Sequence, residues 1–435
     1  MAVFGYYLHL ALRSLKRSTV LTALMVVAIG LGIGASITML TVLHVMNGDP
    51  LPGRSGRLFR PYLNPLPLDF KRSKFGRDPS LDLTWPDAMA LLHAHKAAKQ
   101  VAMAGSRLTA DSEVSGVHPK SVAVRFVTAD FFTMFGVPFA KGRGWAAQDD
   151  ARRAQVVVLT QALARRLLGD SPALGRTVHL GGHDFRVIGV TRPWHPRPLF
   201  YADPAGNFYG DSDAAFMPLS TSVDLGFSVN TTSGWGRDDS LTGASTSWLQ
   251  FWVQLDSAAQ VARYRRFLAA YAARQKAAGR FERPSATAKL YSLRGWLDHL
   301  NLIPQDVRLQ SGLALGFLFV CMLNIVALLL AKFLRRGGEI SVRRALGARR
   351  RDIFAQLGVE SVLIGLGGGA LGLGIAELGL WSVRQRPDAY AQLAHMDLTM
   401  LLSTFVLAVL ASVLAGLLPA WRACRIAPVI QLKTL

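Results

Sequence analysis

The chain has 435 residues, 51% of them hydrophobic, and a formal net charge of +21 at pH 7. A charge this basic is a known sign of nucleic-acid binding. Here, however, three short segments, 1–17, 332–352 and 419–435, hold 14 Lys and Arg against 2 Asp and Glu. They flank long apolar runs on one side, which is the positive-inside pattern of membrane proteins. The composition therefore argues against a soluble nucleic-acid binder and for a membrane protein.

Four apolar runs are long enough to cross a bilayer, which takes about 20 residues. They cover residues 20–46, 309–331, 353–383 and 398–421. Residues 20–45 contain no Asp, Glu, Lys or Arg and exceed the apolar core of a cleaved signal peptide, so we expect this run to be retained. The sequence predicts an integral membrane α-helical bundle of four transmembrane helices, with a large α+β extracytoplasmic domain between helices 1 and 2.

The predicted order of segments places all three basic segments and both termini in the cytoplasm. It consists of a cytoplasmic amphipathic N-terminal segment (1–19), span 1 (20–46), an extracytoplasmic domain (47–308), span 2 (309–331), a cytoplasmic segment (332–352), span 3 (353–383), a short outer loop (384–397), span 4 (398–421) and a cytoplasmic tail (422–435). Residues 4–16 favour either an interfacial amphipathic helix or an inward extension of span 1.

Two carboxylates interrupt span 3. Glu360 lies about two turns from the predicted cytoplasmic end, by the helical rise of about 1.5 Å per residue, and we expect it to pair with Arg351 or with a neighbouring span. Glu377 lies near the outer end, within reach of interfacial water. For Glu360, structural pairing is favoured over a proton relay.

Glycines recur at four-residue spacing within the spans, which lets helix backbones approach closely in lipid. The pairs are Gly30 with Gly34, Gly312 with Gly316, Gly365 with Gly369, and Gly368 with Gly372. Close packing is predicted for Gly365, Gly368, Gly369 and Gly372. A bundle of four helices encloses no wide pathway, so we expect a dimer.

The extracytoplasmic domain alternates strand-like and helix-like segments. Strands are predicted at 122–127, 156–159, 178–180, 185–190 and 248–255, and helices at 161–168 and 258–277, with Thr160 as an N-cap and Gly181-Gly182 as a tight turn. Residues 193–243, rich in Pro, Gly, Asp and Ser, predict an irregular or separately packed subdomain. Its aromatic side chains either form a local core or contact a hydrophobic substrate or partner.

Catalytic and cofactor motifs are missing from the sequence. It contains no G-x-x-x-x-G-K-[ST] loop for ATP, no H-E-x-x-H zinc motif and no G-x-S-x-G nucleophile motif. We therefore expect no catalytic residue, no cofactor and no metal in this chain, which disfavours a membrane hydrolase.

The segment between spans 2 and 3 carries a recognisable pattern. It reads RRGGEISVRRALGA over residues 335–348 and resembles the cytoplasmic signature of MacB/FtsX-type permeases. The tail, GLLPAWRA at 416–423 and APV at 427–429, resembles the ending of that family. Segments of the outer domain resemble the MacB periplasmic core: 127–132, 142–143, 157–159, 174–178 and 187–190.

This resemblance implies the non-catalytic permease subunit of an ABC transporter in the inner membrane. ATP and Mg would be bound by a separate ATPase dimer, since only about 17 residues precede span 1. A coupling helix would contact that ATPase through Glu339, Ile340, Arg343, Arg344, Ala345, Leu346, Gly347 and Ala348. Gly347 would end this helix as a C-cap.

Motion would pass to the outer domain by mechanotransmission, for export or extraction of a peptide, antibiotic, siderophore or lipid-linked substrate. Further partners implied are a second permease chain, identical or homologous, and a membrane fusion protein in a tripartite pump. The alternative is an FtsX-like regulator of a cell-wall enzyme or sensor.

Overall fold

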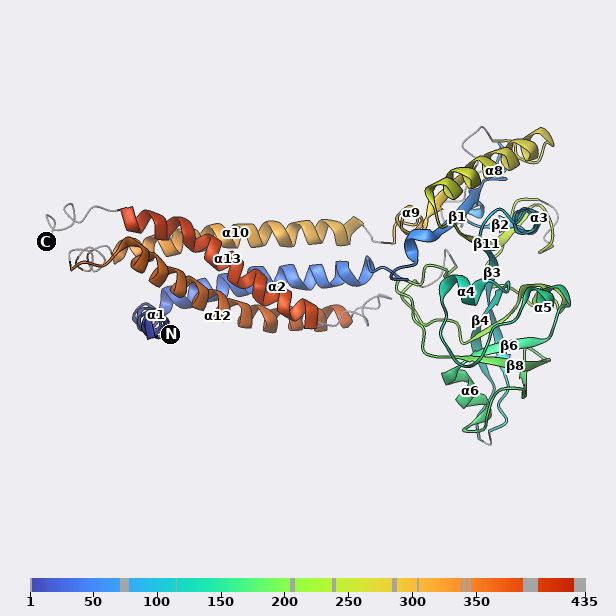
Figure 1. The fold of residues 1–435 in the computed structure, drawn as a ribbon, viewed down its shortest axis with the longest axis horizontal. Coiled ribbons are helices and arrows are strands. Elements are labelled where there is room, and N and C mark those ends of the chain that lie inside the picture. The colour runs from blue at the N-terminus through green and yellow to red at the C-terminus, as the bar shows by residue number, and fades with distance from the viewer. Residues whose placement is uncertain are drawn as a thin grey trace. The chain divides into compact units, whose positions relative to one another are not determined.

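The computed structural model describes residues 2–70, 78–114, 116–203, 208–236, 240–283, 288–302, 305–336, 338, 342, 346–385 and 398–425. Contacts within the chain divide it into two compact units (Figure 1). One, the helical unit, comprises residues 1–47 and 303–435, and the other, the sheet domain, comprises residues 48–302.

The helical unit contains long apolar helices that run side by side (Figure 1). Its described helices are α1 (Ala2–Arg17), α2 (Thr19–Met46), α10 (Gln305–Arg335), α12 (Arg350–Arg384) and α13 (Leu398–Arg425). Among the described residues, three helices are long and apolar enough to cross a membrane: Thr19–Met46, Gln305–Phe333 and Arg351–Arg384. The fourth predicted span coincides with α13, whose apolar stretch of described residues is the shorter Leu401–Leu417.

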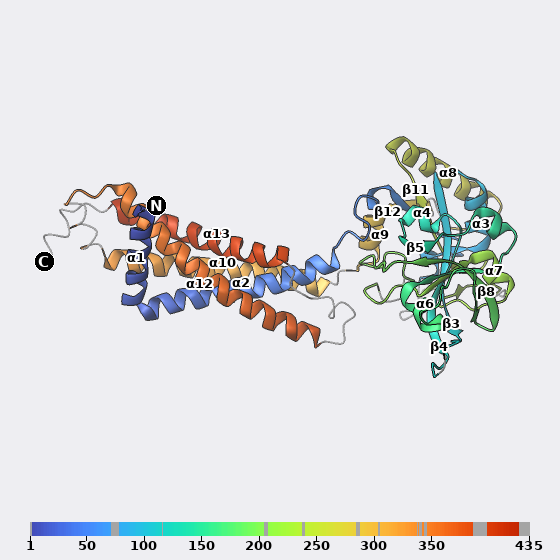
Figure 2. The same ribbon diagram turned by 60° about the horizontal axis from the view of Figure 1, so that its bottom comes forward.

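The first helix, α1, is separate from α2. At Ser18 the backbone leaves the helical region, with φ −127° and ψ 57°, and α1 lies across the ends of the other helices (Figure 2). The alternative in which residues 4–16 simply extend span 1 inward is therefore wrong. Ala11 is fully buried and Leu12 is 45% exposed, so α1 has one face against the bundle and one face away from it.

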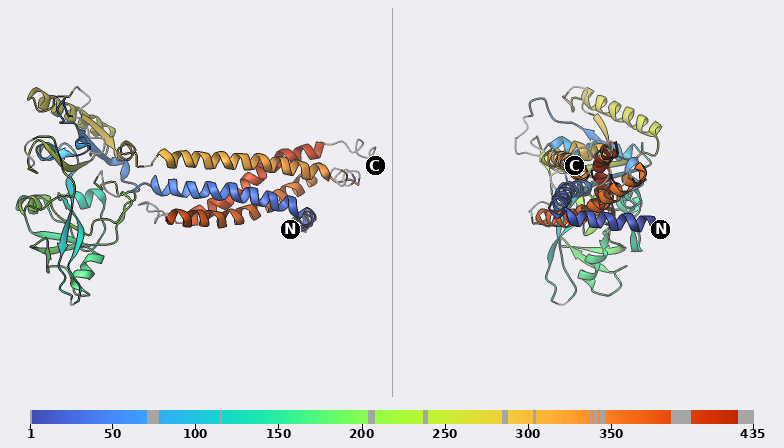
Figure 3. Two further views of the ribbon diagram at one scale, coloured as in Figure 1. Left: turned by 180° about the vertical axis from the view of Figure 1, so that it is seen from behind. Right: turned by 90° about the vertical axis from the view of Figure 1, so that its left-hand side faces the viewer.

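The interior of the helical unit is formed by branched apolar side chains and small residues. Ile29 and Ile33 of α2, Ile325 and Leu329 of α10 and Ile364 of α12 belong to one buried cluster. The helices α2 and α10 lie next to each other (Figure 3), and Ser36 Oγ donates to the backbone oxygen of Ala314 at 3.0 Å. Side-chain packing and a hydroxyl bond therefore hold this pair together.

The sheet domain contains a large mixed sheet with strand order β12-β1-β11-β3-β4-β9-β6-β8-β5; β2 and β10 pair with β11, and β7 pairs with β3 and β8. The pairs β4–β9 and β6–β8 are parallel, and the other described pairs are antiparallel. The described strands are β1 (Leu58–Leu63), β2 (Leu83–Thr84), β3 (Lys99–Ala110), β4 (Lys120–Val127), β5 (Phe139–Gly142), β6 (Val156–Thr160), β7 (Thr177–Leu180), β8 (His183–Thr191), β9 (Ala215–Pro218), β10 (Ser233–Gly234), β11 (Thr246–Gln254) and β12 (Ala288–Ser292).

Helices of the sheet domain pack on this sheet and close its core. They are α3 (Trp85–His93), α4 (Phe131–Phe135), α5 (Ala147–Ala151), α6 (Gln161–Leu168), α7 (Leu219–Asp224), α8 (Ala258–Ala277) and α9 (Leu293–His299), with the short 3-10 turns η1 (Ser55–Arg57) and η2 (Pro79–Leu81). Leu163 and Leu167 of α6 and Tyr264 and Leu268 of α8 belong to the same buried cluster as the central strands.

Several local predictions are confirmed. Thr160 caps α6 by accepting a hydrogen bond from the Leu163 amide at 3.3 Å. The antiparallel strands β7 and β8 are joined at Gly181 (φ +61°) and Gly182 (φ +85°), the left-handed conformations that a two-residue hairpin turn requires. The helix predicted at 258–277 is α8.

The prediction for residues 193–243 is wrong in part. Within this segment, β9 pairs with β4 on one side and β6 on the other, so it lies inside the main sheet. The four residues of β9 are all buried, and a strand this short between turn-forming residues gives little periodic signal. The aromatic residues do form a core: Phe200 and Tyr201 are fully buried, and Trp194 stacks on Tyr201 with ring centroids 5.5 Å apart.

Candidate coupling site

The predicted coupling helix lies only partly within the described residues. Glu339, Ile340, Arg343, Arg344 and Ala345 lie outside them, whereas Leu346, Gly347 and Ala348 are described. The Leu346 amide donates to the backbone oxygen of Val342 at 3.0 Å. Gly347 follows with φ +97°, the conformation that a helix-ending glycine adopts. Leu346 is 83% exposed, so its side chain is available to a partner.

A buried ionic cluster lies at the C-terminal end of α10, shortly before the predicted coupling segment in the sequence. The Nζ atom of Lys332 lies 2.5 Å from Oε1 of Glu360, and an Arg336 guanidinium nitrogen lies 3.3 Å from Oε2 of the same carboxylate. Glu360 also accepts from Ser14 Oγ at 2.9 Å, and Arg336 donates to Ser14 Oγ at 2.6 Å. The Glu360 side chain is completely buried.

This cluster joins three helices at one point. Ser14 belongs to α1, Lys332 is on α10 and Glu360 is on α12. Of the two partners considered from sequence, the neighbouring span is the one that pairs with Glu360, while Arg351 lies near Asp352 at 4.0 Å. Sequence reasoning missed Ser14, Lys332 and Arg336, although the four-residue spacing of Lys332 and Arg336 places both on one helix face.

Glu377, the second carboxylate of span 3, has a different environment. Its side chain is 54% exposed and lies 2.6 Å from an Arg384 guanidinium nitrogen on the same helix. An exposed pair of this kind contributes little to stability, so Glu360 is the carboxylate that links helices.

The predicted packing glycines lie at two helix contacts of α12. A Cβ atom built at Gly365 or Gly369 would lie 2.8 Å from Ser412 Cβ or 2.9 Å from Ala408 Cβ, both on α13. A Cβ at Gly368 would overlap the Ile29 side chain of α2, and one at Gly372 would lie 3.2 Å from the backbone oxygen of Gly30. At each of these four positions, a residue larger than glycine would require the neighbouring helix to shift.

The other glycine pairs divide into two cases. Gly30 and Gly34 of α2 face α12, where Leu371 and Ile375 would collide with a Cβ atom at these positions. Built Cβ atoms at Gly312 and Gly316 of α10 meet no described atom within 4 Å. Close packing within the described chain thus involves the pairs on α2 and α12 but not the pair on α10.

Two family models match this chain, one largely over the sheet domain and one within the helical unit. Residues 22–271 match the MacB-like periplasmic core domain, and residues 311–428 match the FtsX-like permease C-terminal domain. The first match alone covers more than half of the chain. The chain belongs to the MacB/FtsX-type permeases. The resemblance drawn from residues 335–348 and from the tail is thereby confirmed.

Curated relatives of this MacB/FtsX-type permease share modest identity with it. A macrolide export ATP-binding/permease protein MacB of Shewanella sp. (strain ANA-3) is 26% identical over 322 residues, which are 71% of this chain and 43% of that protein. MacB 1/2 of Paracoccus denitrificans (strain Pd 1222) is 26% identical over 334 residues, 73% of this chain and 43% of that protein. The chain therefore spans less than half the length of these relatives.

A solved structure also resembles the chain. It is the periplasmic region of MacB from Actinobacillus actinomycetemcomitans, with 16% sequence identity and a TM-score of 0.35, covering 60% of this chain and 97% of that chain. Long apolar helices together with a MacB-like periplasmic core domain fit an inner-membrane protein with a large periplasmic domain.

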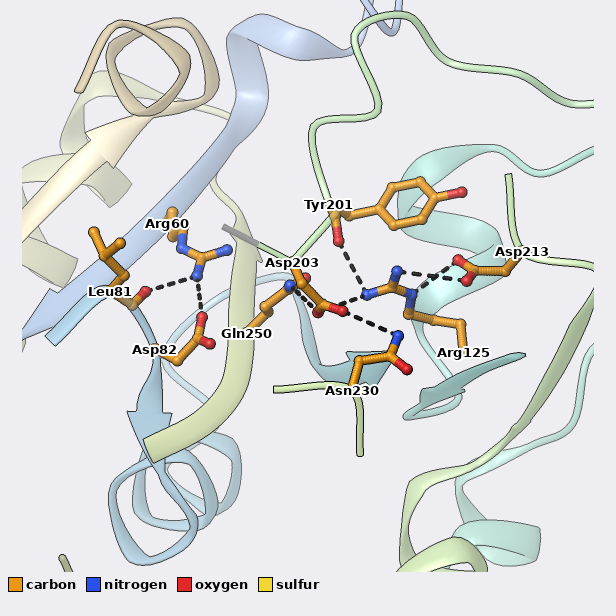
Figure 4. A network of polar contacts seen from close by, with 9 residues as sticks. All are labelled: Arg60, Leu81, Asp82, Arg125, Tyr201, Asp203, Asp213, Asn230 and Gln250. Atoms are coloured by element: carbon orange, nitrogen blue, oxygen red, sulfur yellow. Dashed lines mark hydrogen bonds and ion pairs between the residues drawn. The ribbon is translucent and has the colours of Figure 1, made fainter. Parts of the chain in front are cut away.

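In this MacB-like core, a cavity of about 810 Å³ lies over β3, β4 and α6. Arg125 of β4 lies at its base, 2.9 Å from Asp213 and 3.5 Å from Asp203, and donates to the Tyr201 backbone oxygen at 3.1 Å (Figure 4). Burial lowers the pKa of Arg125, but the charges of Asp213 and Asp203 outweigh it and raise the pKa above its usual range. Arg125 thus stays charged and fixes the segment that carries these two aspartates.

Gln250 extends the same network by donating to Asp203 at 2.8 Å, as Figure 4 shows. A second buried pair, Arg60 with Asp82 at 2.7 Å, lies nearby in the same view. Buried charges remain charged only when they are paired in this way. The network therefore holds the lining of the cavity in one arrangement.

Proposed function

We propose that this chain is the permease subunit of an ABC transporter, driven by ATP hydrolysis on a separate ATPase dimer that binds ATP and Mg. The observation that carries the proposal is the course of α10. Its first residue, Gln305, follows the sheet domain at once, and its last, Arg335, precedes the exposed turn at Leu346 by eleven residues. One helix thus connects the periplasmic domain with the predicted coupling segment.

A helix of this length can transmit motion. With 31 residues, α10 is about 46 Å long by the standard helical rise. It packs beside α2, the helix through which the chain enters the sheet domain. Because Lys332 and Arg336 bind Glu360 on α12, a force on the coupling segment would move α10 and α12 together rather than bend α10 alone.

The proposed topology has four spans, with both termini and residues 332–352 in the cytoplasm and the sheet domain outside. The positive-inside distribution of Lys and Arg supports it. The ionic cluster of Glu360 and the turn at Leu346 would then both lie at the cytoplasmic ends of the helices.

The substrate proposal is broad. Transport or extraction of a peptide, antibiotic, siderophore or lipid-linked molecule is proposed because MacB relatives are described as macrolide exporters. A second permease chain and a membrane fusion protein are further proposed partners, as the family resemblance implies. The cavity of the sheet domain offers charges of both signs to a substrate, since its lining includes Arg107 and Lys120 as well as Asp203 and Asp211.

Regulation of a cell-wall enzyme or sensor is the second candidate function. It is favoured by the FtsX-like match, which covers residues 311–428. That match involves only the helical unit, whereas the MacB-like match covers the larger part of the chain, and transport is therefore preferred.

The test is co-purification of this chain with a candidate ABC ATPase from the same organism, combined with ATPase activity of the complex. Leu346→Asp and Arg344→Glu should each abolish association, because they place negative charge at the predicted docking surface. Leu68→Asp is a matched control, since Leu68 is an exposed leucine of the sheet domain and its replacement should leave association unchanged. Normal co-purification of the Leu346 variant would refute the coupling assignment.

A further inference from the structure

A cavity of about 810 Å³ lies in the helical unit, between the junction of α1 with α2 and the end of α10. Its lining changes character along its length. One part is basic and is formed by Arg17, Lys332, Arg335 and Arg336. The other part is apolar and is formed by Val20, Leu21 and Ala331.

The basic part carries an excess of positive charge. Lys332 and Arg336 share one carboxylate, Glu360, which lies behind them. Arg17 and Arg335 add two further cations, and no acidic side chain occurs among the described residues that line the cavity. Among the described residues, one carboxylate thus accompanies four cations, which leaves a strong positive potential for an anion.

The start of α2 adds to this potential. Ser18, Thr19, Val20 and Leu21 all line the cavity and form the N-cap and first turn of this 28-residue helix. The Ser18 side chain does not cap the helix, and its first turn contains no acidic residue. The amides and the positive end of the helix dipole therefore reinforce the charge supplied by the four cations.

The cavity lies where the helices change from polar to apolar, which indicates an amphiphilic ligand. Both helices change from polar to apolar where they line it: α2 after Thr19, and α10 before Lys332. Val20 is 75% exposed, so the apolar part opens sideways toward the surroundings of the bundle. In a membrane this change of polarity marks the depth of the lipid headgroups.

We propose that this cavity binds one anionic phospholipid, with its phosphate at Arg17 and Arg335 and its acyl chains along Val20 and Leu21. Basic pockets between transmembrane helices are suited to such headgroups. A free inorganic anion would use only the basic part. An acidic segment of a partner protein would leave the sideways apolar opening unused. The lipid links the junction of α1 and α2 to the end of α10, which ties the coupling end of α10 to the bilayer.

The experiment is native mass spectrometry of the full chain in detergent, titrated with phosphatidylglycerol or with phosphatidylcholine of matched acyl chains. The wild-type chain should bind one phosphatidylglycerol in preference to phosphatidylcholine. In Arg17→Gln/Arg335→Gln the affinity for phosphatidylglycerol should fall about 30-fold, since each basic side chain near an anionic lipid contributes about fivefold. Lys332 and Arg336 are left intact because they hold Glu360.

The matched control is Arg13→Gln/Lys16→Gln, which removes the same charge from exposed positions of α1 that do not line the cavity. It should retain the preference, and inorganic phosphate should not displace the lipid. An equal loss in the control would show general surface attraction and overturn the proposal. Displacement of the lipid by phosphate would also overturn it. So would absence of any preference in the wild-type chain, or unchanged affinity for phosphatidylglycerol in Arg17→Gln/Arg335→Gln.

Discussion

Lys332 on α10 and Glu360 on α12 form a buried ion pair, with Nζ and Oε1 2.5 Å apart and side chains 3% and 0% exposed. Arg336 binds the second oxygen of Glu360 and also Ser14 of α1. A single carboxylate therefore fixes the relative positions of three helices at the end of the bundle where the coupling segment begins.

Replacing Glu360 by Gln should destabilise the helical unit strongly. The change would leave Lys332, whose side chain is 3% exposed, without the carboxylate it binds, and breaking a buried pair in this way typically costs about 3–5 kcal/mol. We expect a clearly lower thermal midpoint for the purified chain in detergent. The measurement is thermal unfolding followed by loss of helical circular dichroism.

Glu377→Gln is the matched control for that variant, because it removes the same charge from the same helix. Its pair with Arg384 is half exposed, and exposed pairs contribute about 0–1 kcal/mol. Equal midpoints for the Glu360 and Glu377 variants would contradict the linking role of Glu360.

Gly368→Leu should separate α12 from α2. A Cβ atom at this position already overlaps Ile29, and an overpacked contact of this kind costs about 1–3 kcal/mol. Gly374→Leu on the same helix should have little effect, since a Cβ there meets no described atom within 4 Å. The same thermal measurement compares the two, and an equally stable Gly368 variant would show that the α2–α12 contact tolerates a larger residue.

Much of the local structure was predictable, because its causes lie within a few neighbouring residues. Thr160 before an apolar helical pattern and Gly181-Gly182 between two strand-like runs are local signals, and both elements form as expected. The apolar pattern also indicated the positions of the long helices. These features depend on periodicity, capping and turn conformation, which the sequence displays directly.

What the sequence could not supply depends on contacts between distant segments. The position of β9 between β4 and β6 is set by tertiary pairing of residues about 55 to 90 positions apart. The partner of Glu360 was ambiguous for the same reason, since Ser14 is 346 residues away. The glycines of α12 were recognisable as packing positions, but only the three-dimensional structure shows that Gly368 contacts α2 and Gly369 contacts α13.

The stability of the sheet domain should depend on pH through Asp150. Burial raises the pKa of this carboxyl from 3.8 to about 6, although it accepts hydrogen bonds from the Ala129 amide and Trp145 Nε1. The folded state therefore binds the proton more tightly than the unfolded state. The stabilisation from protonated Asp150 is complete below about pH 4 and is lost as the pH rises through about 6.

Urea unfolding at a series of pH values, followed by tryptophan fluorescence, measures this dependence. Asp150→Asn should flatten the stability profile between about pH 4 and pH 6. Asp184→Asn, which changes a carboxylate that is 71% exposed, should leave the profile as it is in the wild-type chain. An unchanged slope in the Asp150 variant would assign the pH dependence to another group.

Arg125→Met should destabilise the sheet domain more than any exposed charge change, because it removes the cation that both Asp213 and Asp203 bind (Figure 4). The expected loss is about 3–5 kcal/mol in urea unfolding. Arg107→Met, on the neighbouring strand and exposed, should change stability by less than about 1 kcal/mol. Adding Asp213→Asn to Arg125→Met should restore part of the loss, since it removes one of the two carboxylates that lost this cation. If the stability lost in the double variant equals the sum of the losses in Arg125→Met alone and Asp213→Asn alone, Arg125 acts through packing and not through charge.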